Sequence, residues 1–427
     1  MKHLIYTLLI LMIVFHGHLV AQESFTLEEC YSLAIENYPK LRSADISRQI
    51  STLNQLDLNT ACLPSITTQG QATWQSDVTK VDIPNAPFDI PHLSKDQYRI
   101  SVDIRQNIWD GGITHSRRQL EESVLQTSLS NLEVELYRLN EQVVQAFYAA
   151  LTLNLKIQAL EKHSETIKAQ RDKVDSGIRN GTIEQVNAVI LDAEQLQIRQ
   201  ALEEMTSGRD ISLSILSLLT GKEISATASL KQESHKIRNQ VAVNRPELKY
   251  FDSVKEQMDQ QARITSNLRN PKIFGFGQAG YGKPGLNMLK NEFEPYMVIG
   301  AGISWNITDW GKTRRAIQLL EYGKQNIDVE RNTFLHQLEL LRTRQWEEIL
   351  RLERQLQTDG DMIILRQSIT RDAETRMING IITAADYLRE LNLETIAGIN
   401  LATRRLQIEE AYNKYLILSG LQKQNKN

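Results

Sequence analysis

The sequence predicts an α+β membrane protein, with long coiled-coil α-helical hairpins plus four β-strands per chain. Three observations predict this fold. The chain contains an internal repeat, and each copy has a long proline-free stretch in which apolar residues recur at spacings of three and four. Each copy also has segments in which apolar and polar residues alternate strictly, as they do in membrane strands.

The N-terminus has the layout of a secretory signal peptide. Lys2 precedes an apolar run from Leu4 to Phe15, and a cut near Ala21 would release the mature chain. About twelve apolar residues are too few for a retained anchor, because a helix needs about 20 to span a bilayer. We therefore expect residues 1–21 to be a signal peptide.

Composition excludes two classes of protein. A formal net charge of −3 over 427 residues gives no basis for binding nucleic acid. The 2 cysteines, Cys30 and Cys62, do not make a disulfide scaffold, although the sequence leaves a bond between them open.

The repeat organises the chain, with matching motifs about 200 residues apart. Asn-Tyr-Pro-Lys-Leu at 37–41 recurs as Asn-Arg-Pro-Glu-Leu at 244–248, and Trp-Asp-Gly-Gly at 109–112 corresponds to Thr-Asp-Trp-Gly at 308–311. The first copy is longer by a proline-rich insertion within 80–95, which predicts an exposed loop. The repeats are assigned to 22–230 and 231–427.

The segment FGFGQAGYGKPG at 274–285 imitates nucleotide-binding motifs. Gly275, Gly277 and Gly280 match G-x-G-x-x-G, but that motif needs a helix directly after the glycines, and here Lys283-Pro-Gly forms a turn. The corresponding segment of the first repeat, SITTQGQATW, has no such motif. A glycine-rich strand is therefore expected, and no ATP or NAD binding.

Each repeat is expected to contain a short helix, a β-hairpin, a long helix and a return helix. The expected ranges are 39–62, 65–109, 112–176 and 183–220 in the first repeat, and 246–269, 272–308, 311–376 and 383–419 in the second. The heptad-like run from Leu125 to Leu160 favours a coiled coil, and a helix over 112–176 would be about 97 Å long at 1.5 Å per residue. Thr26 and Glu29 form a capping-box pattern for a leading helix.

Period-two alternation gives each strand one apolar and one polar face. The residues expected to face lipid are Ile100, Val102, Ile104, Ile299, Ile303 and Trp305. Phe274 and Phe276 break the pattern, because they fall on the polar face. A half-buried strand of a soluble sandwich remains the alternative. In a membrane, four strands are too few to close a barrel, and an open edge in lipid is not tolerated, so a dimer, trimer or tetramer is required.

The sequence resembles the TolC family of outer-membrane efflux channel proteins over nearly all of the mature chain. The resemblance is carried by Thr-Leu-Glu-Glu at 26–29, the duplicated Asn-x-Pro-x-Leu, the strand-ending motifs at 109–112 and 309–311, and the two glycine-containing tips. It implies a homotrimer with a shared 12-stranded transmembrane β-barrel and a periplasmic α-barrel. It also implies a periplasmic adaptor (membrane fusion) protein and an inner-membrane pump as partners, and places the linker at 222–243 around the middle of the tube.

The resemblance also assigns sites. The residues expected at adaptor-docking tips are Gly177, Ile178, Gly181, Thr182, Met377, Ile378, Gly380 and Ile381. The glycines alone could instead serve only the turn. Asp386 matches an acidic position at the periplasmic entrance, where three copies would form a ring, or it is an ordinary solvated helix residue. The first repeat has Asn187 there, and Arg389 stands where a second acidic residue occurs.

The expected function is an outer-membrane exit duct of a tripartite efflux, or type I secretion-like, system in the bacterial outer membrane, extending into the periplasm. Scattered histidines and the absence of metal or nucleophile motifs favour no enzyme and no cofactor. The alternative is a secreted periplasmic coiled-coil tether or scaffold that conducts nothing.

Overall fold

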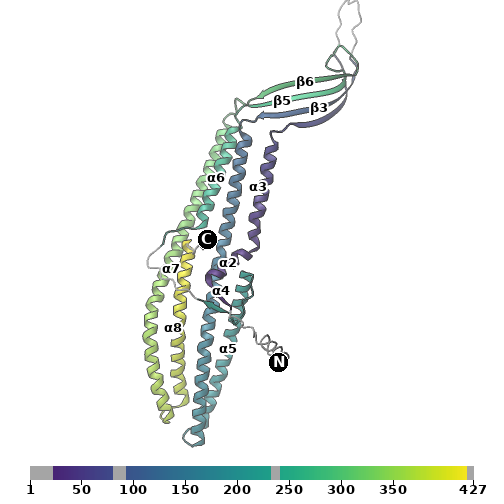
Figure 1. Ribbon diagram of the computed structural model, residues 1–427. Helices are drawn as coiled ribbons and strands as arrows, with labels where there is room; N and C mark the ends of the chain where they lie inside the picture. The colour runs from purple at the N-terminus through teal and green to yellow at the C-terminus, as the bar shows by residue number, and fades with distance from the viewer. Residues whose placement is uncertain (1–22, 80–92, 232–240, 421–427) are drawn as a thin grey trace, which may run out of the picture. The chain divides into compact units, whose positions relative to one another are not determined.

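The computed structural model describes residues 23–79, 93–231 and 241–420 (Figure 1). The predicted signal peptide, most of the proline-rich insertion and the middle of the 222–243 linker lie outside these residues. The fold is mostly helical with few strands, and the chain divides into two compact units. The helical unit comprises Met1–Arg42, Leu132–Pro246 and Thr333–Asn427, and the strand unit comprises Ser43–Asn131 and Glu247–Asn332. Each unit thus contains parts of both repeats.

The strand unit contains a four-stranded antiparallel sheet in the order β2-β3-β5-β6 (Figure 1). Its strands are β2 (Ser65–Trp74), β3 (Asp96–Trp109), β5 (Lys272–Lys283) and β6 (Glu294–Ser304). β2 pairs with β3 and β5 pairs with β6, so each repeat contributes one hairpin. The hairpins are joined into one sheet where β3 pairs with β5.

β6 is shorter than the sequence predicts. It ends at Ser304, whereas alternation continues to Ile307. Ser304 lies opposite Lys272, the first residue of β5. The strand therefore ends where its partner ends, since backbone groups beyond this point have no neighbouring strand to pair with.

The strand unit also contains two short helices, α3 (Ser43–Thr60) and α6 (Pro246–Asn267). The long helices α4 (Ile113–Arg179) and α7 (Lys312–Ile378) begin here and continue into the helical unit, and each has 67 residues. The first turn of the expected 39–62 helix is instead a 3₁₀-helix over Pro39–Arg42.

The helical unit contains α2 (Leu27–Asn37) and two antiparallel hairpins, in which α4 returns as α5 (Gln185–Thr220) and α7 returns as α8 (Ala384–Ser419) (Figure 1). Thr26 and Glu29 make the predicted capping box at the start of α2, which is confirmed. Gly221 and Gly420 end α5 and α8 in the left-handed conformation that favours glycine.

Apolar clusters join these helices. One cluster packs α2 against α4 and α5 through residues that include Cys30, Phe147 and Leu216. A second lies near the hairpin ends and unites both hairpins, with Ile167, Leu191 and Tyr387 in its core. By length and composition, α4 is the one described helix that could cross a membrane. We interpret it as a core helix because Val143, Val144 and Phe147 are fully buried in the first cluster.

A two-stranded parallel sheet was not expected. β1 (Ser24–Thr26) pairs with β4 (Ser229–Lys231), within the helical unit. Each strand has 3 residues, too short for alternation to reveal it. The pairing fixes the start of the described chain beside the linker that follows α5.

Candidate channel wall and helical tips

The two faces of the four-stranded sheet have opposite characters. On one face, the side chains predicted to contact lipid are exposed. The exposed fractions are 55% for Ile100, 75% for Ile299 and 72% for Ile303, and Val102 and Ile104 are also exposed. Water-soluble proteins rarely expose a contiguous apolar surface of this kind, and such a surface marks contact with a membrane or a partner.

Aromatic side chains gather at both ends of the sheet. Near one end, the exposed aromatic residues are Trp74, Tyr98, Tyr281 and Phe293, and near the other they are Trp109, Trp305 and Trp310. The Tyr281 and Phe293 rings stack with centroids 5.6 Å apart. The Trp305 indole N–H donates to the Arg269 carbonyl at 3.0 Å. Aromatic residues at both ends of an apolar band are typical of strands that cross a bilayer.

Sequence reasoning missed these aromatic groups as a feature. It placed Trp305 among the lipid-facing residues of a strand, whereas the residue lies just beyond the end of β6. Spacing along the chain could have revealed the pattern, because Trp74 and Trp109 each end a predicted strand.

The opposite face of the sheet is polar. Ser101 is buried and donates to Asp103 Oδ2 at 2.9 Å, while Gln278 donates to Asp103 Oδ1 at 2.5 Å. The exposed β2 residues of this face, such as Thr67 and Gln69, add further hydrogen-bonding groups. A polar face opposite an exposed apolar one is the arrangement found in membrane barrels with a wet interior.

The glycine-rich segment has a packing explanation. A Cβ on Gly302 would lie 2.6 Å from Phe274 Cζ, and a Cβ on Gly300 would lie 2.6 Å from Phe276 Cζ. The two phenyl rings therefore occupy the space over the glycines of the neighbouring strand. This arrangement explains how aromatic residues fit on the polar face, because ring and glycine pair across strands.

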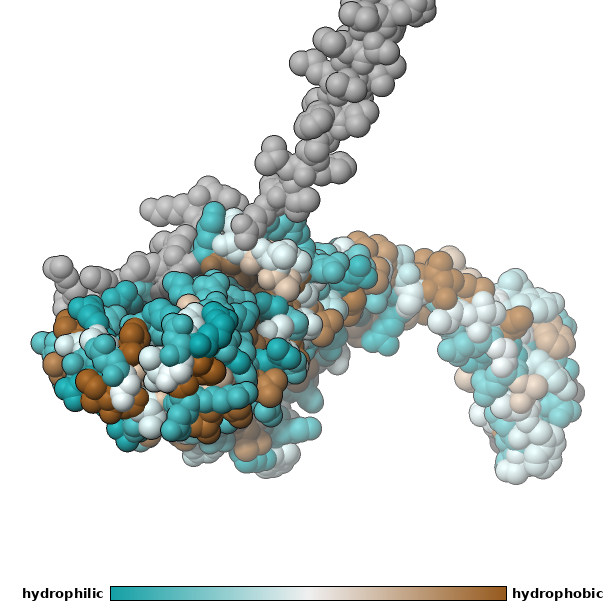
Figure 2. All heavy atoms as spheres, turned by 90° about the horizontal axis from the view of Figure 1, so that it is seen from below, coloured by the Kyte–Doolittle hydropathy of each residue, from teal (hydrophilic) through white to brown (hydrophobic). Residues whose placement is uncertain are grey.

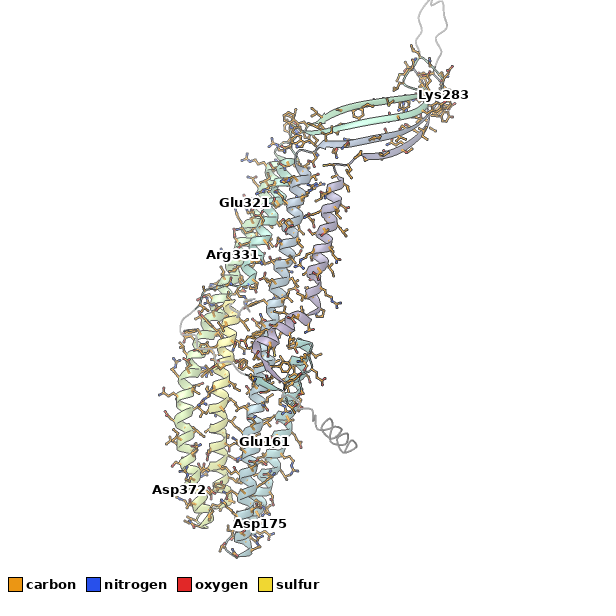
Figure 3. All side chains as sticks on the ribbon, in the orientation of Figure 1. Glu161, Asp175, Lys283, Glu321, Arg331 and Asp372 are labelled. Atoms are coloured by element: carbon orange, nitrogen blue, oxygen red, sulfur yellow. The ribbon has the colours of Figure 1, made fainter. Side chains whose placement is uncertain are left out.

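The same segment does not form a nucleotide site. β5 is a single strand that ends at Lys283, and the next strand, β6, begins at Glu294. No helix occurs in the described chain between Lys283 and Lys312, so the helix N-terminus required by the motif is not there. Figure 3 places Lys283 at the end of the sheet away from α3 and α6.

The turns from strand to long helix are built around aspartates. Asp110 accepts from the backbone N–H groups of Gly112 and Thr114 at 3.0 and 2.6 Å, and Asp309 accepts in the same way from Gly311 and Thr313 at 3.0 Å each. Hydrogen bonds from Thr313 lower the pKa of Asp309 to about 2. The repeated Asp-x-Gly motif thus caps α4 and α7.

The two hairpin tips have matching turns. Thr182 N–H donates to Gly177 O at 2.9 Å, and Ile381 N–H donates to Arg376 O at the same distance. Gly181 and Gly380 adopt φ of 72° and 68°, and a Cβ on either would meet nothing within 4 Å. These glycines are needed for backbone conformation alone.

The predicted tip residues differ in exposure. Ile378 and Ile381 are exposed by 51% and 68%, whereas Met377 is buried at 4% in the cluster near the hairpin ends. Gly177 faces the Ile183 side chain, whose Cδ1 would lie 2.5 Å from an added Cβ. Ile178 is half-buried, and Thr182 is exposed. The exposed surface of the tips is therefore smaller than the predicted set of eight residues.

Asp386 has a local partner. Its Oδ2 accepts from the Thr383 hydroxyl at 2.8 Å and from the Thr383 N–H at 3.2 Å, in a capping box at the start of α8. These hydrogen bonds lower the pKa of the Asp386 carboxyl. Asn187, its counterpart in the first repeat, reaches across to accept the Ala384 N–H at 2.9 Å. Both residues thus serve the same helix start.

Replacing Asn187 with alanine is expected to loosen the start of α8, because the Ala384 N–H loses its acceptor. The expected cost is about 1 kcal/mol of unfolding free energy. Acid should weaken the same helix start, because the lowered pKa of Asp386 means that its cap is present at neutral pH and is lost as pH falls through the carboxyl range. Amide hydrogen exchange of residues 384–388 at pH 7 and at about pH 2, below the carboxyl range, measures both effects. Unchanged protection in Asn187→Ala would contradict the cross-repeat cap.

The repeated Asn-x-Pro motifs also have partners that the sequence did not reveal. Asn37 Nδ2 donates to Thr220 O at 2.8 Å, and the Asn244 N–H donates to Ser419 O at 2.8 Å. Each motif therefore lies at the end of the return helix of the hairpin, α5 or α8. The sequence showed that the Asn-x-Pro motif and the Thr/Ser-Gly that ends each return helix are both repeated. It did not show that the two motifs contact each other.

Metal and disulfide chemistry are not indicated in the parts of the chain that the structure describes. There, no group of three or more His, Cys, Asp or Glu side chains could hold a metal ion. Cys30 is buried, Cys62 is exposed, and both are free.

Comparison with known proteins matches part of the chain to a family and most of it to solved structures. Residues 30–222 match the model of the outer membrane efflux protein family. No curated protein matches the chain by sequence. Among solved structures, the Campylobacter jejuni CmeC outer membrane channel is 15% identical with a TM-score of 0.65, and the match covers 92% of this chain and 85% of that one.

Two further structures have the same fold. VceC, an outer membrane protein from Vibrio cholerae, is 14% identical with a TM-score of 0.66, covering 92% of this chain and 96% of its own. The open state of the Neisseria gonorrhoeae MtrE outer membrane channel is 13% identical with a TM-score of 0.64, covering 94% and 91%.

The family match accounts for the first repeat, and the shared fold extends over both. Proteins of this family are channels rather than enzymes, and they lie in the bacterial outer membrane and extend into the periplasm. On this evidence residues 30–222 match the outer membrane efflux protein family, and the chain shares its fold with solved outer-membrane channels.

Proposed function

We propose that the protein is the outer-membrane exit duct of a tripartite efflux, or type I secretion-like, system. Three copies share a 12-stranded barrel, and substrates pass through it without energy input from this protein. A periplasmic adaptor and an inner-membrane pump deliver them. The observation that carries the proposal is the open four-stranded sheet with an exposed apolar face.

The edges of this sheet support a shared barrel. β2 and β6 each pair with one strand only, so each leaves a row of backbone groups without a strand partner. In lipid, such groups cannot be left unpaired, and a closed barrel is the solution open to a sheet. β2 of one copy pairing with β6 of the next would close it, and three copies give twelve strands.

Apolar stripes on the helices support assembly of the same kind. In the strand unit, Ile46, Ile50 and Leu53 of α3 recur at spacings of four and three and are exposed by 53% to 63%. Stripes at this spacing are typical of helices that pack against a partner helix. We assign a second copy of this chain as the partner.

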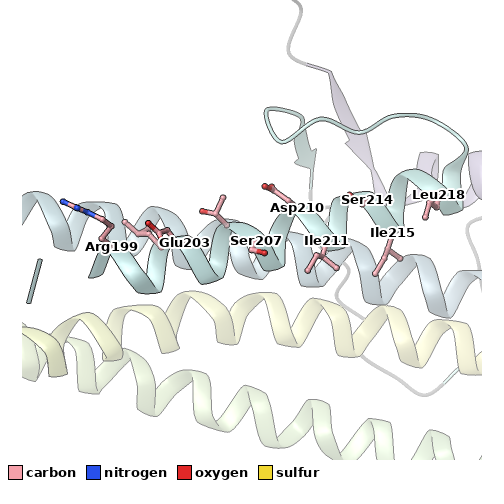
Figure 4. Close-up of a pocket in the computed structure, with 10 residues that line it drawn as sticks. Arg199, Glu203, Ser207, Asp210, Ile211, Ser214, Ile215 and Leu218 are labelled. Atoms are coloured by element: carbon pink, nitrogen blue, oxygen red, sulfur yellow. The ribbon is translucent and has the colours of Figure 1, made fainter. Parts of the chain in front are cut away.

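α5 carries a similar stripe in the helical unit. Ile211, Ile215 and Leu218 line a shallow hollow of about 730 Å³ along this helix (Figure 4), and Leu218 is 84% exposed. Figure 2, which views the molecule from below, shows further hydrophobic side chains between hydrophilic ones on the surface. A second copy covering the α5 stripe would remove these side chains from water.

The exposed tip residues are proposed to meet the adaptor, and Asp386 the entrance. Ile381 and Ile378 offer apolar contact there, and the acidic Asp175 and Asp372 lie on the last turns of the long helices (Figure 3). The tether hypothesis gives no role to the exposed apolar face of the sheet.

A crosslinking experiment in cells tests the adaptor contact. A photoreactive residue at Ile381, which is 68% exposed, should crosslink to a periplasmic protein, whereas the same residue at Leu340, 60% exposed and far from the tip along α7, should not. Deleting the gene should raise accumulation of exported dyes. Equal adaptor crosslinking at both positions, or unchanged accumulation, would count against the duct.

A further inference from the structure

Two arginines on the polar face of the sheet lie over aromatic rings. The Arg105 guanidinium carbon is 4.4 Å from the centroid of the Phe274 ring, and that of Arg99 is 5.9 Å from the centroid of the Tyr296 ring. Both arginines are exposed. The rings are themselves held over glycines, since a Cβ on Gly280 would collide with the Tyr296 ring. The arrangement is therefore built by three adjacent strands, β3, β5 and β6.

Neither arginine has an anionic partner. In the described residues, neither guanidinium group makes an ion pair or a hydrogen bond, and both contact the rings. Asp103 lies between them in β3, but its carboxylate is held by Ser101 and Gln278 instead.

One further polar atom on this face of the sheet lacks a hydrogen-bond partner. The Tyr296 hydroxyl is enclosed and makes no hydrogen bond. Enclosed hydroxyl groups normally find an acceptor. Arg99 and Arg105 are six residues apart in β3, about 20 Å along the strand. The polar face thus carries two arginine–aromatic clusters, Arg105 with Phe274 and Phe276, and Arg99 with Tyr296. Each combines one uncompensated positive charge with a ring face.

We propose that each of these two arginine–aromatic clusters is a binding site for one small aromatic anion, and that solutes of this class bind there as they leave the duct. The carboxylate or sulfonate of such a solute would take the charge-assisted hydrogen bonds that the arginine of that cluster leaves unmade. Its aromatic body would stack on the guanidinium plane and on the neighbouring rings, those of Phe274 and Phe276 beside Arg105 and that of Tyr296 beside Arg99. The inference rests on the proposed function, which makes the polar face the wall of the duct.

Binding is tested directly on detergent-solubilised protein by saturation-transfer NMR. The probe is naphthalene-2-sulfonate, compared with cyclohexanesulfonate, which lacks the aromatic ring, and with a naphthylmethylammonium ion, which reverses the charge. Empty micelles give the background. We expect the naphthalenesulfonate to bind most tightly, and the double variant Arg99→Gln/Arg105→Gln to weaken it about tenfold.

A matched control uses Lys272→Gln, which removes a positive charge at the end of β5 on the same face, where no aromatic contact is made. It should leave binding unchanged within about twofold. In the Arg99→Gln background, which leaves the Arg105 cluster intact, Phe276→Leu should weaken binding of the naphthalenesulfonate but not of the cyclohexanesulfonate. Equal binding of all three probes, or equal loss in the lysine and arginine variants, would overturn the site. Because the particle mass is measured separately, a trimer that fails to bind disproves this inference alone, and a monomer disproves the duct.

Discussion

Replacing Ile299 with arginine is expected to prevent assembly in the membrane. Ile299 lies at the middle of β6 and is 75% exposed on the apolar face. An arginine at the centre of the lipid face of a barrel costs about 2–4 kcal/mol, and a trimer places three of them in lipid. Ile100→Arg on β3 should act in the same way. The measurement is the amount of trimer in isolated outer membranes.

Thr67→Arg is the control for these variants. Thr67 is exposed on the polar face of β2, directly opposite Asp103, so an arginine there stays on the polar face. This variant should assemble at the normal level. Normal assembly of Ile299→Arg would show that the apolar face does not contact lipid and would favour the soluble tether.

Replacing Gly420 with alanine should unfold the end of α8. Gly420 has φ of 79°, and an added Cβ would collide with the backbone carbonyl of Asn244. The left-handed conformation costs a residue with a Cβ about 1–2 kcal/mol, and crowding adds about 1–3 kcal/mol. We expect a large loss in the free energy of unfolding of the solubilised protein.

Gly380→Ala separates the two causes. Gly380 has φ of 68° but nothing within 4 Å of an added Cβ, so only the conformational cost applies. Thermal unfolding followed by circular dichroism compares the two variants. If both lose the same stability, the contact between Gly420 and Asn244 contributes nothing.

Local pattern predicted most of the fold. Apolar spacing along α4 predicted a long helix because a helix buries one stripe, and alternation from Tyr98 to Ile104 predicted a strand because a strand exposes two faces. The predicted C-terminal end of β6 was wrong, because a strand ends where its partner strand ends. β1 and β4 were missed because a strand of three residues is too short to show alternation.

The site was less predictable, since its contacts join distant parts of the chain. Nothing near Asn187 in the sequence indicates that it caps α8, and Met377 looked like its exposed neighbour Ile378 until packing buried it. The glycines at 274–285 matched a motif by spacing, but their function is to make room beside aromatic rings. The spacing of a motif indicates a function only when the surrounding backbone has the structure that the function needs.

The protein mass of the particle extracted from outer membranes in mild detergent tests the shared barrel most directly. Light scattering corrected for bound detergent should give three chains per particle, since four strands per chain then close a twelve-stranded barrel. A monomer that leaves the membrane without detergent would contradict the shared barrel and with it the duct.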